Sequence, residues 1–456
     1  MKQSHSISIF IVGCIAIIIS IITLQGCCNS GVPTPSDDKH IPEYHVLTNK
    51  QETLDIESGH LSLFVDYSNC IADGMASPFY QKMVSPLTAA TKEYWSIKGS
   101  KISKEEGSVY VLLNNIQNTN YAALDKAINQ MASLNSESVL LTDGELFTQT
   151  ATKNNPNNPY MHDAFKTWLL RGHDIHIIAE PYIENYNGRQ FNKKRFYIIF
   201  TDDRIDGNIY NRIKQVVDFT DSPEVDEFHL SGNYPWIVPT NGVASTPNVN
   251  IAANVNHYGN FEVQEWPLSW DNIIAIIANT FDEEGNPLAN GDKLIGGLKI
   301  NRNAFGCYRI SDVGIRVSNI NESYNTLYDA LEQGLSGQGL SLNESPIEKF
   351  VLLDIDEFKR HSNVDIYFDI NNFAPSKDTE LNGYLNNYFK IEIYVKDIED
   401  ILENNIDIFN FDSLTSPGQK NISISESLKN CVVDQELTNK LKGKVLYTIY
   451  VKSEKY

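Results

Sequence analysis

The sequence predicts an α/β protein in which a mostly parallel, doubly wound sheet is followed by a β-rich, sandwich-like C-terminal region. Two observations carry this prediction. Between Gly59 and Gly232, short apolar runs typical of buried strands alternate with segments of helical periodicity, which favours parallel strands covered by helices on both faces. From about Pro235 onward, strand-like runs follow one another between turn clusters, with few helices. The 456 residues suffice for two or three domains.

Five strands and four helices are expected in the first domain, residues 59–232. The strand-like runs are 60–68, 108–115, 138–145, 174–180 and 195–203, and the helical segments are 78–95, 119–134, 159–173 and 208–219. Pro86 interrupts or kinks the first helix, Thr119 or Asn120 caps the second, and Gly172 stops the third.

The second region, residues 235–456, is expected to form one or two antiparallel β-sandwich modules. Its strand-like runs are 272–281, 293–300, 350–358, 364–370, 389–395 and 445–451. The best helical segment is 323–333.

The N-terminus has the pattern of a secretory signal. Lys2 precedes an apolar stretch from Ile7 to Leu24, which ends in the sequence Leu24-Gln25-Gly26-Cys27. This ending resembles the bacterial lipobox, which implies cleavage of residues 1–26 and acylation of Cys27. The alternative is a single transmembrane anchor, since the apolar run is nearly long enough to span a bilayer.

The residues after Cys27 are expected to form a flexible tether, residues 27–58, that holds the domains away from a membrane. Cys28, rather than an aspartate, follows the lipidated position, and by resemblance to lipoprotein sorting signals this implies the outer membrane. The sequence Ser36-Asp37-Asp38 loosely resembles the acidic export signals of some surface lipoproteins, so the protein is either surface-exposed or faces the periplasm.

Net charge and cysteine content indicate which ligands and metal ions the protein can bind. A net charge of −21 argues against nucleic acid, which needs a basic footprint, and is compatible with divalent cations. No cysteine and histidine spacing indicates a zinc site. A disulfide between Cys307 and Cys431 is conceivable in an oxidising compartment, but sequence alone does not give the pairing.

Three polar pieces of the first domain fall where ligands bind such sheets. Asp66 and Ser68 stand in the polar end of the first run, Thr119 precedes a helix, and Asp143 follows Leu140 and Leu141 in the polar turn that ends the run 138–145. Together they resemble the von Willebrand factor A domain, also called the integrin I-like domain, over roughly residues 59–232. By this resemblance, Asp66, Ser68, Thr119 and Asp143 form a metal-ion-dependent adhesion site for Mg²⁺, with an open position for a carboxylate of a protein ligand.

Cys70 departs from the family pattern, because it stands where a second serine is expected. A thiol is a poor ligand for a hard cation, so the site is predicted to be weakened. There are also purely structural alternatives: Asp66 and Ser68 as caps of the next helix, Thr119 as an N-cap, and Thr142-Asp143-Gly144 as an ordinary turn.

Other polar residues of the first domain are assigned structural roles. His162, His173 and His176 are expected to be packing or surface residues, and the turn Asp202-Asp203-Arg204 is expected to be solvated. Hydrolase and P-loop motifs are absent from the sequence.

The leading hypothesis is therefore a lipid-anchored envelope protein that is not an enzyme and that binds a protein or other ligand with the help of Mg²⁺. One alternative is a metal-free structural scaffold in envelope assembly. The other is a surface hydrolase that uses the same carboxylates to hold a catalytic ion, although no general base stands out near them.

Overall fold

The computed structural model describes a large part of the chain. The described residues are 40–48, 55–116, 122–146, 156–232, 256–258, 261–265, 273–279, 293–300, 302–304, 308–347, 351–368, 386–401 and 406–454. The signal segment 1–26, Cys27, Thr119 and Cys307 lie outside these residues, and only the backbone of Cys70 is described.

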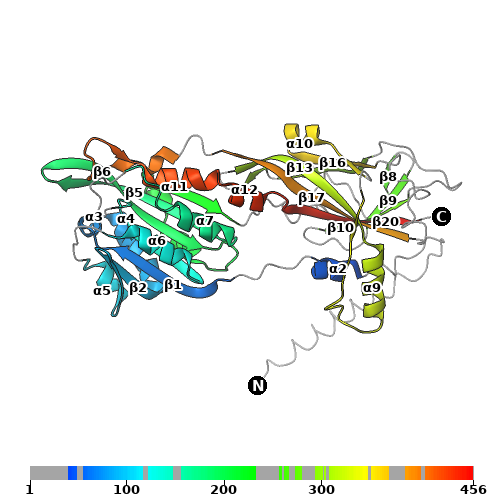
Figure 1. Cartoon of the computed structure of the whole chain (residues 1–456), viewed down its shortest axis with the longest axis horizontal. Helices are drawn as coiled ribbons and strands as arrows, with labels where there is room; N and C mark the ends of the chain where they lie inside the picture. The colour runs from blue at the N-terminus through cyan, green and yellow to red at the C-terminus, as the bar shows by residue number, and fades with distance from the viewer. Residues whose placement is uncertain are drawn as a thin grey trace, which may run out of the picture.

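A seven-stranded sheet forms the centre of the first domain (Figure 1). Its strands lie in the order β3-β2-β1-β4-β6-β5-β7. They are β1 (Glu57–Asp66), β2 (Thr91–Lys98), β3 (Lys101–Glu105), β4 (Ser136–Thr142), β5 (Asp174–Tyr186), β6 (Arg189–Thr201) and β7 (Asp226–Ser231). The domain is an α/β structure, as the alternating pattern predicts.

The sheet is mixed, and its parallel pairings are confined to the centre. β1 pairs in parallel with β2 and with β4. β6 runs antiparallel between β4 and β5, because β5 and β6 form a long hairpin. Four strands, β1, β2, β4 and β5, consequently point the same way, and the other three run against them. The predicted parallel character holds for these central strands and not for the sheet's margins.

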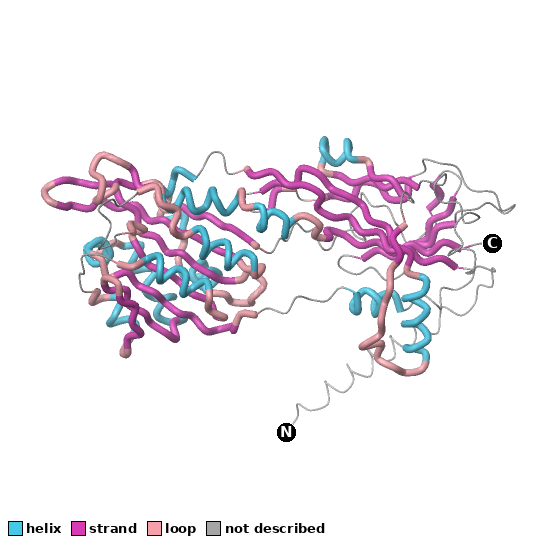
Figure 2. Tube along the Cα trace, viewed as in Figure 1, coloured by secondary structure: helices cyan, strands magenta, loops and turns pink. Residues whose placement is uncertain are grey.

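Helices cover both faces of this sheet, which is what a doubly wound architecture requires (Figure 2). Strand β1 directs Leu63 and Val65 to one face and Phe64 to the other, as alternation in a strand dictates. One face is covered by α3 (Asn69–Gly74), α4 (Pro78–Ala90) and α8 (Ile209–Val216). The other is covered by α6 (Leu124–Ala132) and α7 (His162–Leu170).

Three predicted elements of the first domain differ from the structure, and in the second region the expected strand 350–358 is a strand only at Val351–Leu353 and is followed by a helix, Ile355–His361. The expected strand 108–115 is a short helix, α5 (Val109–Leu113), in which Ser108 is at the N-cap position. The expected helix 78–95 ends at Ala90, where the β-branched Thr91 begins strand β2 with its half-buried pattern. The helix expected from Thr119 or Asn120 begins only at Leu124. In each case a short apolar run fits both periodicities, and tertiary packing decides between them.

The second region is built mainly of antiparallel sheet. An eight-stranded sheet contains β8 (Asn256–Tyr258), β9 (Phe261–Glu265), β10 (Ile273–Asn279), β12 (Asn303–Ala304), β13 (Tyr308–Asn319), β14 (Ser345–Pro346), β17 (Asn386–Asp400) and β20 (Val445–Glu454). Its one parallel pairing among the described strands joins β10 and β20. A three-stranded sheet contains β11 (Lys293–Lys299), β15 (Val351–Leu353) and β16 (Asn363–Phe368). The helices α9 (Asn321–Glu332) and α10 (Ile355–His361) accompany these sheets.

A segment near the C-terminus folds back onto the first domain. It contains the 3₁₀ turn η4 (Ile406–Phe409), β18 (Phe411–Asp412), β19 (Lys420–Asn421), α11 (Ser423–Val432) and α12 (Gln435–Leu441). α11 and α12 contact α7, and β18 contacts β6. α11 packs because Ile424, Leu428 and Cys431, spaced four and three residues apart, form one buried face.

The described parts of residues 55–232 and 406–441 pack against one another, and we call them the α/β lobe. The prediction placed 406–441 in the β-rich region 235–456. Within the predicted tether 27–58, residues Ile41–Thr48 form a helix, α2. Its Ile41 and Tyr44 pack against Tyr324 of α9 and Tyr450 of β20. Among the described helices, none combines the length and apolar composition needed to cross a membrane.

Candidate functional site

Asp66 and Asp143 lie side by side at the carboxyl ends of two neighbouring strands. β1 and β4 pair in parallel with Val65 opposite Leu141, so the residues that follow both strands emerge at the same edge of the sheet. Both carboxylates are almost fully buried, with 1% and 3% of their surface exposed. Thr142 Oγ1 donates a hydrogen bond to Asp66 Oδ2 over 2.9 Å and so ties the end of β4 to Asp66. The structure thus brings together two of the predicted site residues.

Ser68 belongs to the same edge, and capping does not account for its side chain. The Ser68 backbone N–H donates to Asp66 Oδ1 over 2.8 Å. Ser68 is at the N-cap position of α3, yet its hydroxyl makes no capping hydrogen bond. The buried Ser68 Oγ has no hydrogen-bond partner in the described structure. A buried hydroxyl without a partner is costly, and it sits beside two carboxylates.

The two carboxylates repel one another in a buried region, where their charges are poorly screened. Burial raises the pKa of Asp66, and the nearby charge of Asp143 raises it further. The hydrogen bonds from Ser68 and Thr142 oppose this shift but do not cancel it, and the pKa is about 7. At neutral pH the pair therefore gains from a proton or from a cation placed between the carboxylates.

Lys193, which was not among the predicted site residues, provides part of the missing positive charge. Lys193 Nζ, on β6, lies 2.6 Å from Glu145 Oε2 and 3.5 Å from Asp143 Oδ2. Glu145 in turn donates its backbone N–H to Asp143 Oδ1 over 3.0 Å. Burial alone would raise the pKa of Glu145, but the Lys193 charge and hydrogen bond outweigh it, and the pKa is lowered.

The signal for this lysine was present in the sequence. Asn187 and Gly188 have φ values of 50° and 73°, the left-handed conformation that an Asn-Gly hairpin turn adopts. This turn reverses the chain between β5 and β6. The reversal makes β6 antiparallel to β4 and so brings Lys193 beyond the carboxyl end of that strand.

The C-terminal segment covers the turn that follows β4. Glu145 accepts hydrogen bonds from the hydroxyl of Ser413 and from the backbone N–H groups of Leu414 and Thr415. These partners are about 270 residues away in the sequence. Glu145 therefore contacts both Lys193 and the C-terminal segment, and this segment covers this part of the sheet edge.

Two members of the predicted set are not placed. Thr119 lies outside the described residues, and only the backbone of Cys70 is described. The nearest described residue after Thr119 is Ala122, which forms a bridge with Gly99 just beyond the end of β2.

The histidines and the turn after β6 lie elsewhere. His173 contacts Asp202 through Nδ1 over 2.8 Å and Asp55 through Nε2 over 2.6 Å. Arg204 donates to both oxygens of Asp202. Burial opposes ionisation of Asp202, but the hydrogen bonds from Arg204 and His173 prevail and lower its pKa to about 2. Asp202 is completely buried, so the predicted solvated turn is in part an internal ion-pair network.

Cys431 and His162 make contacts that join α7 to the C-terminal segment. Cys431 is a free, buried thiol that donates to the backbone carbonyl of His162 over 3.4 Å. The His162 side chain contacts Asp163 and Asp434 on the outside of α7.

The donor set at the carboxyl edge fits a hard cation. Asp66, Asp143 and Ser68 offer only oxygen atoms, which are the ligands that Mg²⁺ prefers, and the unpartnered Ser68 hydroxyl is one such donor. Comparisons with models of protein families, with curated proteins and with solved structures give no match for this chain. The functional argument therefore rests on the geometry and chemistry of the chain itself.

Proposed function

We propose that the protein is a lipid-anchored envelope protein whose α/β lobe binds Mg²⁺ at Asp66, Ser68 and Asp143, and through it a carboxylate of a protein ligand. One observation carries the proposal: two buried, adjacent carboxylates lie near the buried Ser68 hydroxyl, which has no hydrogen-bond partner of good geometry among the described residues. The resemblance of Asp66, Ser68, Thr119 and Asp143 to a von Willebrand factor A adhesion site supports it. A bound Mg²⁺ supplies an electrophilic centre with a position open to a ligand oxygen.

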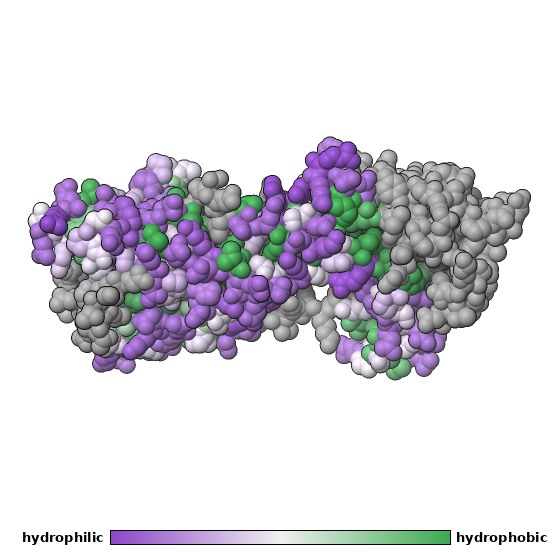
Figure 3. Space-filling view, turned by 45° about the horizontal axis from the view of Figure 1, so that its top comes forward, coloured by the Kyte–Doolittle hydropathy of each residue, from purple (hydrophilic) through white to green (hydrophobic). Residues whose placement is uncertain are grey.

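The chain's own residues hold the donors ready for a cation. Asp66 is fixed from two sides, by the Ser68 backbone N–H and by the Thr142 hydroxyl. Asp143 is fixed by the Glu145 backbone N–H. Because the carboxylates are already buried and oriented, cation binding avoids the free-energy cost of ordering these two side chains. On the face shown in Figure 3, the described part of the α/β lobe is mostly hydrophilic, which suits recognition by charge.

Attachment to the outer membrane through a lipid on Cys27 completes the proposal. Its support is the signal-like N-terminus and the resemblance of Leu24-Gln25-Gly26-Cys27 to a lipobox. The β-rich, sandwich-like region would then act as a stalk or a second binding surface. Replacement of Cys27 by serine should release the protein from the membrane fraction and abolish palmitate labelling. Unchanged membrane association would contradict the anchor.

A metal-free scaffold is the second candidate, and a specific observation favours it. The Lys193 ammonium group lies 3.5 Å from Asp143 and already provides one positive charge at this edge. The C-terminal segment also closes the turn at Glu145. In this case the edge is an internal ion-pair network in which Asp66 keeps its proton.

The test is the effect of Mg²⁺ on thermal unfolding of the full chain. Mg²⁺ should raise Tm in a concentration-dependent way, since a ligand present at 100 times its Kd adds about 2.7 kcal/mol to the free energy of unfolding. The double variant Asp66→Asn with Asp143→Asn should lose this response. Asp163→Asn is the matched control, because the Asp163 side chain is 88% exposed and lies on α7. It should respond like the wild type.

Cys70, which departs from the family pattern, provides a second variant for this test. Cys70→Ser places a hydroxyl where the resemblance expects one, so it should increase the affinity for Mg²⁺. A wild-type chain whose Tm does not move with Mg²⁺, together with an unresponsive Cys70→Ser variant, would exclude the metal-binding proposal and leave the scaffold.

A further inference from the structure

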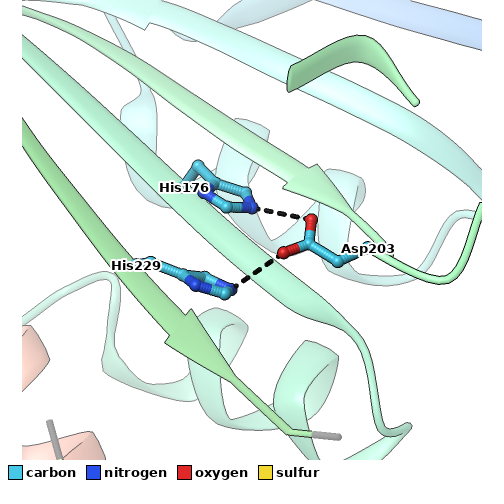
Figure 4. A group of neighbouring side chains, drawn as sticks. All are labelled: His176, Asp203 and His229. Carbon is cyan, nitrogen blue, oxygen red and sulfur yellow. Dashed lines mark hydrogen bonds and ion pairs between the residues drawn. The ribbon is translucent and has the colours of Figure 1, made fainter. Parts of the chain in front are cut away.

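A second group of metal-ligating side chains lies at the opposite end of the same sheet. His176 is near the start of β5, His229 is near the end of β7, and Asp203 follows the end of β6. β5 and β7 are antiparallel with His176 directly opposite His229, so both rings stand on one face of the sheet. Figure 4 shows both imidazoles directed toward the Asp203 carboxylate. We call these three residues the histidine site.

The spacing of the three side chains matches that of ligands around one ion. His176 Nε2 lies 2.9 Å from Asp203 Oδ1, and His229 Nε2 lies 3.5 Å from Asp203 Oδ2. One ligand atom from each residue lies within 4.8 Å of the other two. Two ligands bound about 2.1 Å from a zinc ion are roughly 3.0–3.4 Å apart at right-angled or tetrahedral geometry. The two imidazole–carboxylate separations fall close to this range.

The His176 ring stacks on both of its faces, and because it lies within 12° of parallel to His229, one of the two imidazoles would turn about its Cβ–Cγ bond when both bind the same ion. It stacks on Tyr210 with the ring centroids 3.6 Å apart, and on His229 with the centroids 4.1 Å apart. Tyr210 is itself fixed, because its hydroxyl donates to Glu227 over 2.5 Å. His176 Nδ1 is buried and has no hydrogen-bond partner in the described structure. That nitrogen can carry the imidazole proton while Nε2 presents its lone pair to a metal.

Asp174 orients the Asp203 ligand. Its Oδ2 accepts the backbone N–H of Asp203 over 2.8 Å, as outer hydrogen bonds commonly do for carboxylate ligands. Its Oδ1 lies 2.9 Å from His229 Nε2, the nitrogen that would bind the ion, so coordination would replace this contact. The buried Asp174 carboxylate also adds negative charge beside the site, which favours a cation there.

We infer that His176, Asp203 and His229 bind a borderline transition-metal cation of the zinc class, with water or an outside ligand in the remaining coordination positions. Two imidazoles and one carboxylate select such ions over Mg²⁺ and Ca²⁺, which prefer oxygen donors alone. Three protein ligands leave at least one position open. Side-chain exposures of 17% for His229 and 37% for Asp203 give solvent access to that position.

The experiment is a zinc titration of the full chain, purified without a polyhistidine tag and stripped of metal with a chelator. Calorimetry should show one Zn²⁺ bound per chain, and Co²⁺ in its place should give visible absorption from a low-symmetry site. His229→Gln should weaken Zn²⁺ binding at least about 100-fold, since it removes one of three ligands. Asp203→Asn is a second ligand variant at a more exposed position.

Two controls make the result specific. His60→Gln removes a histidine from β1, outside the histidine site, and should leave Zn²⁺ affinity unchanged. The double variant Asp66→Asn with Asp143→Asn should also keep it, which separates this site from the proposed Mg²⁺ site. A wild-type chain that binds no Zn²⁺ would overturn the inference and leave these contacts as ordinary hydrogen bonds. Unchanged Zn²⁺ affinity in both His229→Gln and Asp203→Asn would overturn it as well.

Discussion

Burial and neighbouring groups shift the pKa values of Asp66 and Asp202, at the two ends of the seven-stranded sheet, in opposite directions. At the carboxyl end, Asp66 and Asp143 lie beside each other, and burial with like charge raises the pKa of Asp66 to about 7. At the other end, Asp202 and Asp203 have cationic or imidazole partners, whereas the buried Glu137 accepts hydrogen bonds from the Thr201 hydroxyl and the Ile209 N–H. Asp202 is held by Arg204 and His173, and these bonds overcome the effect of burial to lower its pKa to about 2.

The carboxylates of Asp66 and Asp143 repel one another, whereas the carboxylate of Asp202 is paired with positively charged or hydrogen-bonding groups. Paired and hydrogen-bonded carboxylates stabilise the folded state, whereas adjacent carboxylates with too little positive charge destabilise it. Perturbed groups of the second kind are concentrated at functional sites. The carboxyl end therefore gains most from an added cation, and Lys193 determines how much compensation it already has.

The largest effect is expected from removal of Lys193. Lys193→Met leaves Glu145 and Asp143 buried without their cation, which should lower the free energy of unfolding by about 3–5 kcal/mol. Lys194→Met is the matched control, because Lys194 pairs with Asp226 over 2.6 Å in a partly exposed position. Its cost should be about 0–1 kcal/mol. Urea denaturation at pH 7 measures both.

Adding Mg²⁺ gives a second test of the comparison between Lys193→Met and Lys194→Met. If the carboxyl end accepts a metal ion, Mg²⁺ should restore part of the stability that Lys193→Met loses. Equal losses for Lys193→Met and Lys194→Met would mean that the buried ammonium group compensates nothing, and the contrast between the two ends would fail.

The two ends should also differ in the sign of their pH dependence. The pKa of Asp66 is raised from 3.8 to about 7, so its contribution to stability is fully present below pH 3.8 and is lost as the pH rises through about 7. The pKa of Asp202 is lowered to about 2, so its contribution is present above pH 3.8 and is lost as the pH falls through about 2.

Single amide variants test these signs. From pH 4 to pH 8, Asp66→Asn should gain about 4 kcal/mol in stability relative to the wild type, at about 1.4 kcal/mol per pKa unit. Asp202→Asn should lose about 2 kcal/mol at pH 7 and little near pH 2. Thermal unfolding measured from pH 2 to pH 8 gives both curves. Parallel curves for the wild type and Asp66→Asn would show that the carboxylate pair is not strained.

Much of the α/β lobe could be predicted from hydrophobic periodicity, and its failures have physical causes. The strand that ends at Asp66 and the strand that precedes Asp143 are both observed, because long apolar runs followed by polar turns allow few alternatives. Short segments were ambiguous. Residues 108–115 fit a strand as well as a helix, and only their packing beside α4 makes Val109–Leu113 helical.

Long-range pairing was the part that local sequence could not supply. Asp66 and Asp143 were both predicted at the carboxyl ends of strands, with a shared site implied by the family resemblance, and the structure pairs these two strands in parallel. The partners of Glu145 come from a segment about 270 residues away, which no local pattern indicates. The histidine site depends on the antiparallel pairing of β5 and β7, so spacing along the chain does not reveal it.

The smallest expected effect tests whether the C-terminal segment helps to shape the carboxyl end. Gly144 has φ +75°, and an added Cβ would lie 2.7 Å from Ile424 Cδ1 of α11 and 3.0 Å from Phe196. Gly188 has nearly the same φ, +73°, with open space around it. Gly188→Ala should therefore cost about 1–2 kcal/mol from backbone strain alone. Gly144→Ala should cost about 1–2 kcal/mol more from overpacking, a modest amount because the end of the Ile424 side chain can shift. Urea denaturation gives the two costs, and limited proteolysis of residues 406–441 should be faster only in Gly144→Ala. Equal costs and equal proteolysis would mean that the returning segment does not constrain the turn beside Asp143.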